Sequence, residues 1–125
     1  MHLEELKQLI LQVLEDSKAQ NLVVLDVTSV SSVTDYMIIA SGTSSRQVTA
    51  MAQNLHYQLK ERNQEPLGIE GMEDGEWVLV DLGDILVHLM QPATREFYSL
   101  EKLWGEFTNT GNQPQDPNPA AHHRI

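Results

Sequence analysis

Residues 77–90 read WVLVDLGDILVHLM, and this segment is the most informative about the architecture. It contains two runs rich in aliphatic residues, 77–82 and 84–90, and only Gly83 clearly interrupts them. Two such runs separated by a turn-forming residue are typical of a β-hairpin. We therefore predict two antiparallel strands joined by a tight turn at Gly83.

Outside the hairpin, the spacing of apolar residues predicts two long helices and two more strands. Apolar residues recur at intervals of three and four over residues 3–19 and 45–62, which is the pattern of amphipathic helices. Two runs of apolar and β-branched residues, 22–27 and 35–42, show no strict alternation. Such runs indicate strands that are covered on both faces, and we expect the first of them to be a central strand.

The rest of the chain contains shorter elements. Residues 63–75 are rich in Gly and predict a connection with at most a short strand at 67–69. A helix is expected over residues 92–98, where the proline suits the first turn, and a final short helix over 100–104. The proline-rich tail, 106–125, has no apolar periodicity, and we expect it to be disordered.

The order of these elements predicts the fold class. It implies an α/β (α+β) fold, in which a mixed β-sheet has helices packed mainly on one face. The passage from Tyr36 through the second long helix to Trp77 predicts a right-handed crossover. The length of 125 residues corresponds to one domain, which we expect over residues 1–105.

Composition excludes several classes of function. The 8 Lys and Arg residues oppose 18 Asp and Glu residues, so the net charge is −10. A surface this acidic repels phosphate backbones, so we expect no direct nucleic-acid recognition and favour a basic partner. The chain has no cysteine, which excludes disulfides, thiolate zinc sites and a cysteine nucleophile. Neither a signal peptide nor a membrane-spanning apolar run is present, which predicts a cytoplasmic protein with no membrane partner.

Gly42, Thr43 and Ser44 lie between a predicted strand and a predicted helix, where free backbone N–H groups can bind an anion. This short loop lacks the Gly-Lys-Ser/Thr of a P-loop and does not complete a Gly-x-Gly-x-x-Gly motif. Ser44 and Gln47 have the spacing of a capping box, which uses the same N–H groups. We therefore favour an ordinary turn and helix cap over a phosphate site.

A strand, a Gly-Thr-Ser turn and a helix also occur in nucleotidyltransferases, in which two or three carboxylates bind divalent cations. These enzymes need a pair of acids that alternate on one face of the next strand. Here the helix carries no acid until Glu61, and Asp81 and Asp84 flank a turn instead. We favour turn chemistry for both aspartates and expect no metal site and no cofactor.

The histidines predict no catalytic centre. His88 is the only histidine in a predicted strand, and the sequence offers no nucleophile or orienting group to pair with it. We favour a structural role for His88 over a role as general base. His122 and His123 lie in the tail without the further ligands that a closed metal site needs.

Residues 63–94 contain seven acidic residues and neither Lys nor Arg. Alternation along the hairpin places six residues on one face and aliphatic residues on the other. The six are Trp77, Leu79, Asp81, Leu86, His88 and Met90. If the aliphatic face packs on the helices, the six form an exposed face in which Trp and Met suit an interface and the acids attract a basic partner. We favour this docking face over the alternative that Trp77 caps the core beneath a solvated acidic surface.

Four motifs, in this order, resemble the ribosomal silencing factor family, also called the Iojap family. They are DYMIIASGTSSR at 35–46, PLGIEG at 66–71, WVLVDLGDILVH at 77–88 and LEKLW at 100–104. The resemblance covers residues 2–105, and the tail from Glu106 onward has no counterpart in the family pattern.

This resemblance implies a translational repressor that is not an enzyme. Members of the family bind the large ribosomal subunit through its protein numbered fourteen, at the surface that meets the small subunit, and so block subunit joining. The resemblance also implies a nucleotidyltransferase-like topology without catalysis, and a homodimer, since family members are known to form them.

The resemblance further implies a set of docking residues. They are Trp77, Asp81, Leu82, His88, Met90 and Tyr98. Trp77 would be the apolar anchor, and Asp81 would face Lys or Arg of the partner. Alternation alone places Leu82 on the opposite face, unless the turn at Gly83 redirects it. The alternative from a different class is a nucleotidyltransferase-like enzyme or nucleotide-binding protein that uses the Gly42-Thr43-Ser44 turn together with Asp81 and Asp84.

Overall fold

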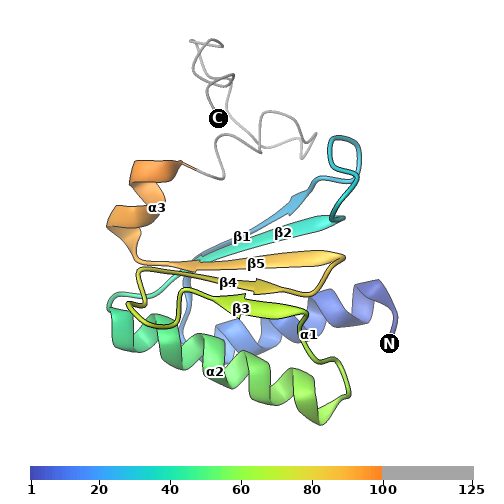
Figure 1. Cartoon of the computed structure of the whole chain (residues 1–125), viewed down its shortest axis with the longest axis horizontal. Helices are drawn as coiled ribbons and strands as arrows, with labels where there is room; N and C mark the ends of the chain where they lie inside the picture. The colour runs from blue at the N-terminus through green and yellow to red at the C-terminus, as the bar shows by residue number, and fades with distance from the viewer. Residues whose placement is uncertain (100–125) are drawn as a thin grey trace.

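The computed structural model describes residues 1–99, so the predicted helix at 100–104 and the predicted disorder of the tail lie outside the described residues. The strands are β1 (Gln20–Asp26), β2 (Tyr36–Ser41), β3 (Gly68–Glu70), β4 (Trp77–Asp81) and β5 (Ile85–Met90). They form one sheet in the order β1-β2-β5-β4-β3 (Figure 1). The pairing of β2 with β5 is parallel and the other three pairings are antiparallel, which confirms the mixed sheet.

The hairpin at residues 77–90 forms as predicted. β4 and β5 pair so that Trp77 lies opposite Met90 and Asp81 lies opposite Leu86. In the turn, Gly83 has a φ of +84°, a conformation that glycine adopts without strain. The Gly83 N–H donates to Asp81 Oδ1 at 2.9 Å, so this aspartate has the turn role that we favoured.

The helices are divided between the two faces of the sheet (Figure 1). α1 (Leu3–Asp16) and α2 (Ser45–Glu61) cover one face, and the short α3 (Pro92–Tyr98) lies on the other. The apolar stripes of α1 and α2 pack on the aliphatic face of the hairpin in one buried core. Its members include Leu6, Ile10, Leu14, Leu55, Leu59, Val78, Val80, Val87 and Leu89. The prediction that helices pack mainly on one face is therefore confirmed.

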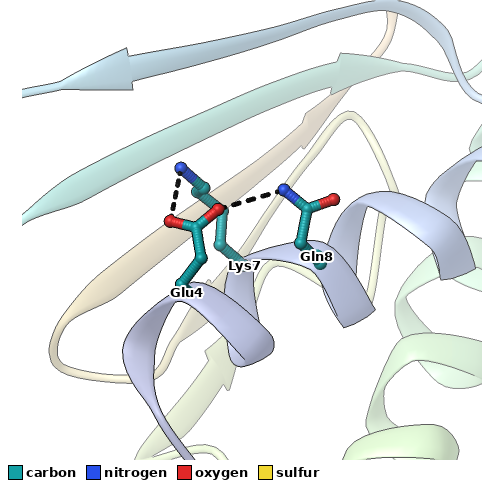
Figure 2. A network of polar contacts seen from close by, with 3 residues as sticks. All are labelled: Glu4, Lys7 and Gln8. Carbon is teal, nitrogen blue, oxygen red and sulfur yellow. Dashed lines mark hydrogen bonds and ion pairs between the residues drawn. The ribbon is translucent and has the colours of Figure 1, made fainter.

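Lys7 connects α1 to the sheet. Its Nζ lies 3.1 Å from Glu4 Oε1 and 4.5 Å from the centroid of the Tyr36 ring on β2. Gln8 donates to the other carboxylate oxygen of Glu4 at 3.2 Å (Figure 2). The hydrogen bonds from Gln8 and then Lys7 lower the pKa of the exposed Glu4. The ionised carboxylate thus helps to hold the ammonium over the aromatic ring, where a cation is attracted by the ring quadrupole.

β1 is an edge strand, which corrects the prediction of a central one. Among the described strands it pairs with β2 alone. Leu22 and Val24 pack against the helix-side core, whereas Val23 and Leu25 pack on the opposite face of the sheet. The run therefore lacks alternation because both faces of this sheet are apolar, and an edge strand can satisfy that pattern as well as a central one.

The predicted crossover from Tyr36 to Trp77 is also wrong. β2 runs parallel to β5, and β4 runs antiparallel to β5, so β4 runs antiparallel to β2. After α2 the chain first forms β3 and β4, and it returns to a parallel strand only at β5. The handedness rule for parallel connections thus does not apply to the passage that ends at Trp77.

α1 ends earlier than its apolar period predicts. Its last residue is Asp16, and Lys18 has a φ of +67°, in the left-handed region that commonly ends a helix. The Ala19 N–H donates back to the Leu14 carbonyl at 3.0 Å. The chain therefore turns sharply after Asp16 and enters β1 at Gln20.

Candidate functional site

Four rings form a continuous row from the interior of the sheet to the surface, and we call it the aromatic row. It consists of His88, Trp77, Tyr98 and Phe97. The hairpin places Trp77 and His88 on one face, and the end of α3 adds the other two rings. The ring centroids lie 5.8 Å apart from His88 to Trp77, 4.8 Å from Trp77 to Tyr98 and 5.0 Å from Tyr98 to Phe97. These separations are those of interacting aromatic pairs.

Trp77 and His88 also share a hydrogen bond. The indole Nε1–H donates to His88 Nδ1 at 2.9 Å. An indole nitrogen can only donate, so Nδ1 of His88 carries a lone pair and the neutral imidazole has its proton on Nε2. Burial lowers the pKa of His88 to about 4, because a charged ring would lose its hydration. The imidazole is therefore neutral near pH 7.

The position of α3 is fixed by hydrogen bonds to the strands and to the loop before β4. Arg95 Nη1 donates to Ser41 Oγ at the end of β2 at 2.8 Å, and both residues are buried. At the start of α3, the Gln91 N–H donates to the Glu76 carbonyl at 3.0 Å and Gln91 Nε2 donates to the Gly75 carbonyl at 3.1 Å. These contacts hold Tyr98 against Trp77.

The face that carries the aromatic row has an apolar cluster of its own. Its fully buried members come from three strands and from the segment after β1. They are Leu25, Val27, Met37, Ile39 and Met90, with Val23, Trp77 and Leu86 packed against them. The sheet thus has a second apolar face, opposite α1 and α2.

This cluster corrects the prediction that the whole hairpin face is exposed. Met90 is 0% exposed and His88 only 7%. Met37 and Ile39 of the neighbouring strand β2 lie in the same cluster as Met90, and Ile39 is the register partner of His88. Trp77 is half-buried and Tyr98 is 51% exposed, so these two predicted docking residues are accessible.

Asp81 and Leu82 lie at the far end of the hairpin from the aromatic row. Asp81 is four residues along β4 from Trp77, roughly 13 Å at the usual rise of a strand. Leu82 is half-buried and packs against the helix-side core, on the face that alternation predicts. The structure therefore gathers Trp77, His88 and Tyr98, with Met90 opposite Trp77, and separates Asp81 and Leu82 from them.

Phe97 belongs to the aromatic row but is absent from the predicted set of docking residues. It is 80% exposed and meets Tyr98 edge-on, with an angle of 86° between the ring planes. Adjacent residues of a helix point in different directions, so a short helix cannot bury two consecutive aromatic rings on one face. The two consecutive aromatic residues Phe97 and Tyr98 are therefore a sequence signal that one of the two rings is exposed.

The sequence model of the family described as "Ribosomal silencing factor during starvation" matches residues 1–124. The chain belongs to the ribosomal silencing factor family. The resemblance drawn from the motifs is therefore confirmed, and the match continues past Gly105 into the tail, where the motifs predicted no counterpart.

Individual relatives of this ribosomal silencing factor support the same family assignment. Ribosomal silencing factor RsfS of Chromobacterium violaceum is 45% identical over 105 residues, which cover 84% of this chain and 86% of the relative. A crystal structure of a Chromobacterium violaceum protein is similar with a TM-score of 0.82 and 42% identity, covering 94% of this chain and 92% of that chain. Mitochondrial assembly of ribosomal large subunit protein 1 of Mus musculus is 39% identical over 99 residues, or 77% of this chain and 43% of the relative.

Ribosomal silencing factors are ribosome-binding factors without enzymatic activity, so family membership confirms that this chain is not an enzyme. Its Gly42-Thr43-Ser44 turn is used by the chain's own side chains. Ser44 Oγ accepts the Gln47 N–H at 3.1 Å, and Gln47 Oε1 accepts the Thr43 N–H at 2.7 Å. Ser44 and Gln47 therefore form the reciprocal cap that we favoured over a phosphate site. The bond to the Gln47 side chain comes from the N–H of Thr43, one residue before the N-cap Ser44.

Two further findings concern residues 1–99 of this silencing factor. Within this range, no group of three or more His, Asp or Glu side chains is placed to hold a metal ion. No helix of the same range has the length and apolar character that crossing a bilayer requires.

Proposed function

We propose that this ribosomal silencing factor binds the large ribosomal subunit through its aromatic row and prevents the small subunit from joining. The observation that carries the proposal is the exposed end of the row, where Phe97 and Tyr98 extend outward from the half-buried Trp77. Aromatic side chains gathered on one face of a small domain are typical of a protein interface. Membership of a ribosome-binding family supports the ribosome as the partner.

The contacted component is the large-subunit protein numbered fourteen, as the family resemblance implies. The name of the mouse relative, which refers to assembly of the mitochondrial large ribosomal subunit, supports a large-subunit partner. The net charge of −10 favours a basic docking surface. Binding to ribosomes would place the chain in the cytoplasm.

The docking residues have different tasks in this proposal. Trp77 is the anchor and Tyr98 extends the apolar contact, while Asp81 lies at the rim and faces a Lys or Arg. Leu82 packs on the other face of the sheet, so it would reach the partner only from the turn at the end of the hairpin. Met90 supports Trp77 from the opposite strand. Phe97 joins the predicted set because it is exposed beside Tyr98.

The mechanism is exclusion and needs no chemical step. An interface of standard size buries roughly 800 Å² on each partner, which a domain of this size can supply. A domain bound at the joining surface occupies space that the small subunit must enter. Repression then depends on the fraction of large subunits that carry the factor.

Replacement of the anchor tests the proposal. Trp77→Ala should weaken binding to purified large subunits by about 2 kcal/mol or more, roughly 30-fold, if the indole is a buried hot spot. Co-sedimentation with separated subunits measures the affinity. The matched control is Tyr57→Ala, because Tyr57 is 60% exposed on α2, on the other side of the sheet. A folded Trp77→Ala protein that binds as well as the control would overturn the assignment.

Two expectations from the resemblance are tested with the same protein. For the nucleotidyltransferase-like alternative, calorimetric titration with magnesium and a nucleotide should give no binding heat, because the turn at Gly42 is occupied by its own cap. For the homodimer, sedimentation equilibrium at rising concentration should show a second species. The nucleotidyltransferase-like topology stays a prediction.

A further inference from the structure

We propose that His88 is a positioning residue for docking, which holds the indole of Trp77 in the orientation that the partner recognises. The inference rests on the proposed function of the aromatic row. It gives His88 a task different from the direct partner contact that the resemblance implied. His88 is 7% exposed, so its ring offers almost no surface to a partner.

The geometry around Trp77 restricts both side-chain torsions of the indole. On one side its Nε1–H donates to His88 Nδ1 at 2.9 Å, with the two ring planes tilted by 45°. On the other side lies the Tyr98 ring, with its centroid 4.8 Å away. Trp77 is the first residue of β4 and only half-buried, so packing alone does not enclose it. The hydrogen bond supplies the missing directional contact.

The choice of histidine at this position is not explained by packing. His88 Nε2 is buried and has no hydrogen-bond partner among residues 1–99. Because Nδ1 must accept from the indole, the proton is on Nε2, so the unpartnered atom is a donor. Leaving such a donor buried is unfavourable, and an apolar side chain between Leu79 and Ile39 would avoid it. The lone pair that His88 offers to Trp77 accounts for its presence.

Replacing His88 with asparagine or with glutamine tests the roles of its two ring nitrogens separately. Asparagine places its carbonyl oxygen near the position of Nδ1, whereas glutamine reaches toward the position of Nε2. We therefore expect His88→Asn to bind large subunits within about threefold of the unmodified chain, and His88→Gln and His88→Leu to bind at least about tenfold more weakly. Urea unfolding of each variant shows whether the compared proteins are equally folded.

A spectroscopic readout separates positioning from general destabilisation. In a Trp104→Phe background, Trp77 gives the one indole N–H signal in a ¹H–¹⁵N spectrum. In the unmodified chain and in His88→Asn, the indole N–H should be hydrogen-bonded and its proton should exchange slowly with solvent. In His88→Leu and His88→Gln, its resonance should move and its proton should exchange faster. The imidazole ¹⁵N signals of the unmodified chain should show the proton on Nε2, and a proton on Nδ1 would contradict the proposal whatever the variants do.

The outcomes distinguish this inference from the proposed function. If Trp77→Ala loses binding while folded His88→Leu keeps it, His88 does not position the anchor but the docking function stands. If Trp77→Ala keeps binding, the docking function itself fails. If His88→Gln keeps binding and His88→Asn loses it, the partner uses Nε2 directly and the positioning role is wrong.

Discussion

The imidazole of His88 makes the stability of the fold depend on pH. Burial lowers its pKa to about 4, from 6.5 for an unperturbed histidine. Between these values the unfolded chain binds a proton that the folded chain does not. Above about pH 7, the titration of His88 should therefore leave the free energy of unfolding unchanged. As the pH falls from about 7 to about 4, it should lower the free energy of unfolding by roughly 3 kcal/mol.

A comparison with His88→Asn isolates this contribution. Urea unfolding of both proteins between about pH 8 and pH 4 gives two stability curves. Other acidic groups titrate in both proteins and cancel in the difference; Asp26, whose pKa is lowered by hydrogen bonds from Thr28, is one of them. We expect the unmodified chain to lose stability relative to the variant as the pH falls. Parallel curves would show that His88 does not titrate in this way.

The long elements could be predicted because their signals come from residues close together in the chain. The cap formed by Ser44 and Gln47 begins α2, and Gly83 turns the hairpin. The edge position of β1 could not be predicted, because strand order depends on pairing between distant segments. The burial of Met90 could not be predicted either, since Met37 and Ile39 of the neighbouring strand help to cover it.

The segment between β3 and β4 approaches the start of β4 too closely for a side chain. A Cβ at Gly71 would lie 2.0 Å from the Trp77 carbonyl oxygen, and Gly71 has a φ of +93°. Gly71→Ala should therefore lower the free energy of unfolding by at least about 2 kcal/mol, from backbone strain and the clash together. Relief of that clash would displace Trp77, the proposed anchor of the aromatic row.

Gly68→Ala is the matched control for this substitution. A Cβ at Gly68, on β3, would have no atom of residues 1–99 within 4 Å. We expect its free energy of unfolding to change by no more than about 0.5 kcal/mol. Thermal or urea unfolding measures both variants, and large-subunit binding should fall only for Gly71→Ala. Equal stability of the two proteins would contradict the predicted strain at Gly71.

The aromatic row depends on the whole molecule, which is why the sequence indicated only part of it. Alternation placed Trp77 and His88 on one face from local information. The contact between Trp77 and Tyr98 requires α3 to fold back over the sheet, where Arg95 donates to Ser41. That contact joins β2 to a helix more than fifty residues later, and no local pattern encodes it.

The charge of the whole chain should set how fast it finds its partner. A net charge of −10 attracts a basic surface over distances near the Debye length, which shortens from about 10 Å at 0.1 M salt to about 3 Å at 1 M. We expect the association rate with large subunits to fall about tenfold between about 0.05 and 0.5 M salt, while the dissociation rate changes less. Stopped-flow mixing with labelled subunits measures both rates.

Two variants that each remove one negative charge show which part of the acidic surface steers association. Glu96 is exposed on α3 next to Phe97 of the aromatic row, whereas Glu15 is exposed on α1, across the sheet. Glu96→Gln and Glu15→Gln change the net charge equally, so any difference between them reflects position. Glu96→Gln should slow association more at low salt, and the two variants should converge at high salt because screening removes the steering. Equal slowing by both would mean that net charge alone guides the encounter, and no salt dependence would leave docking to shape and apolar contact.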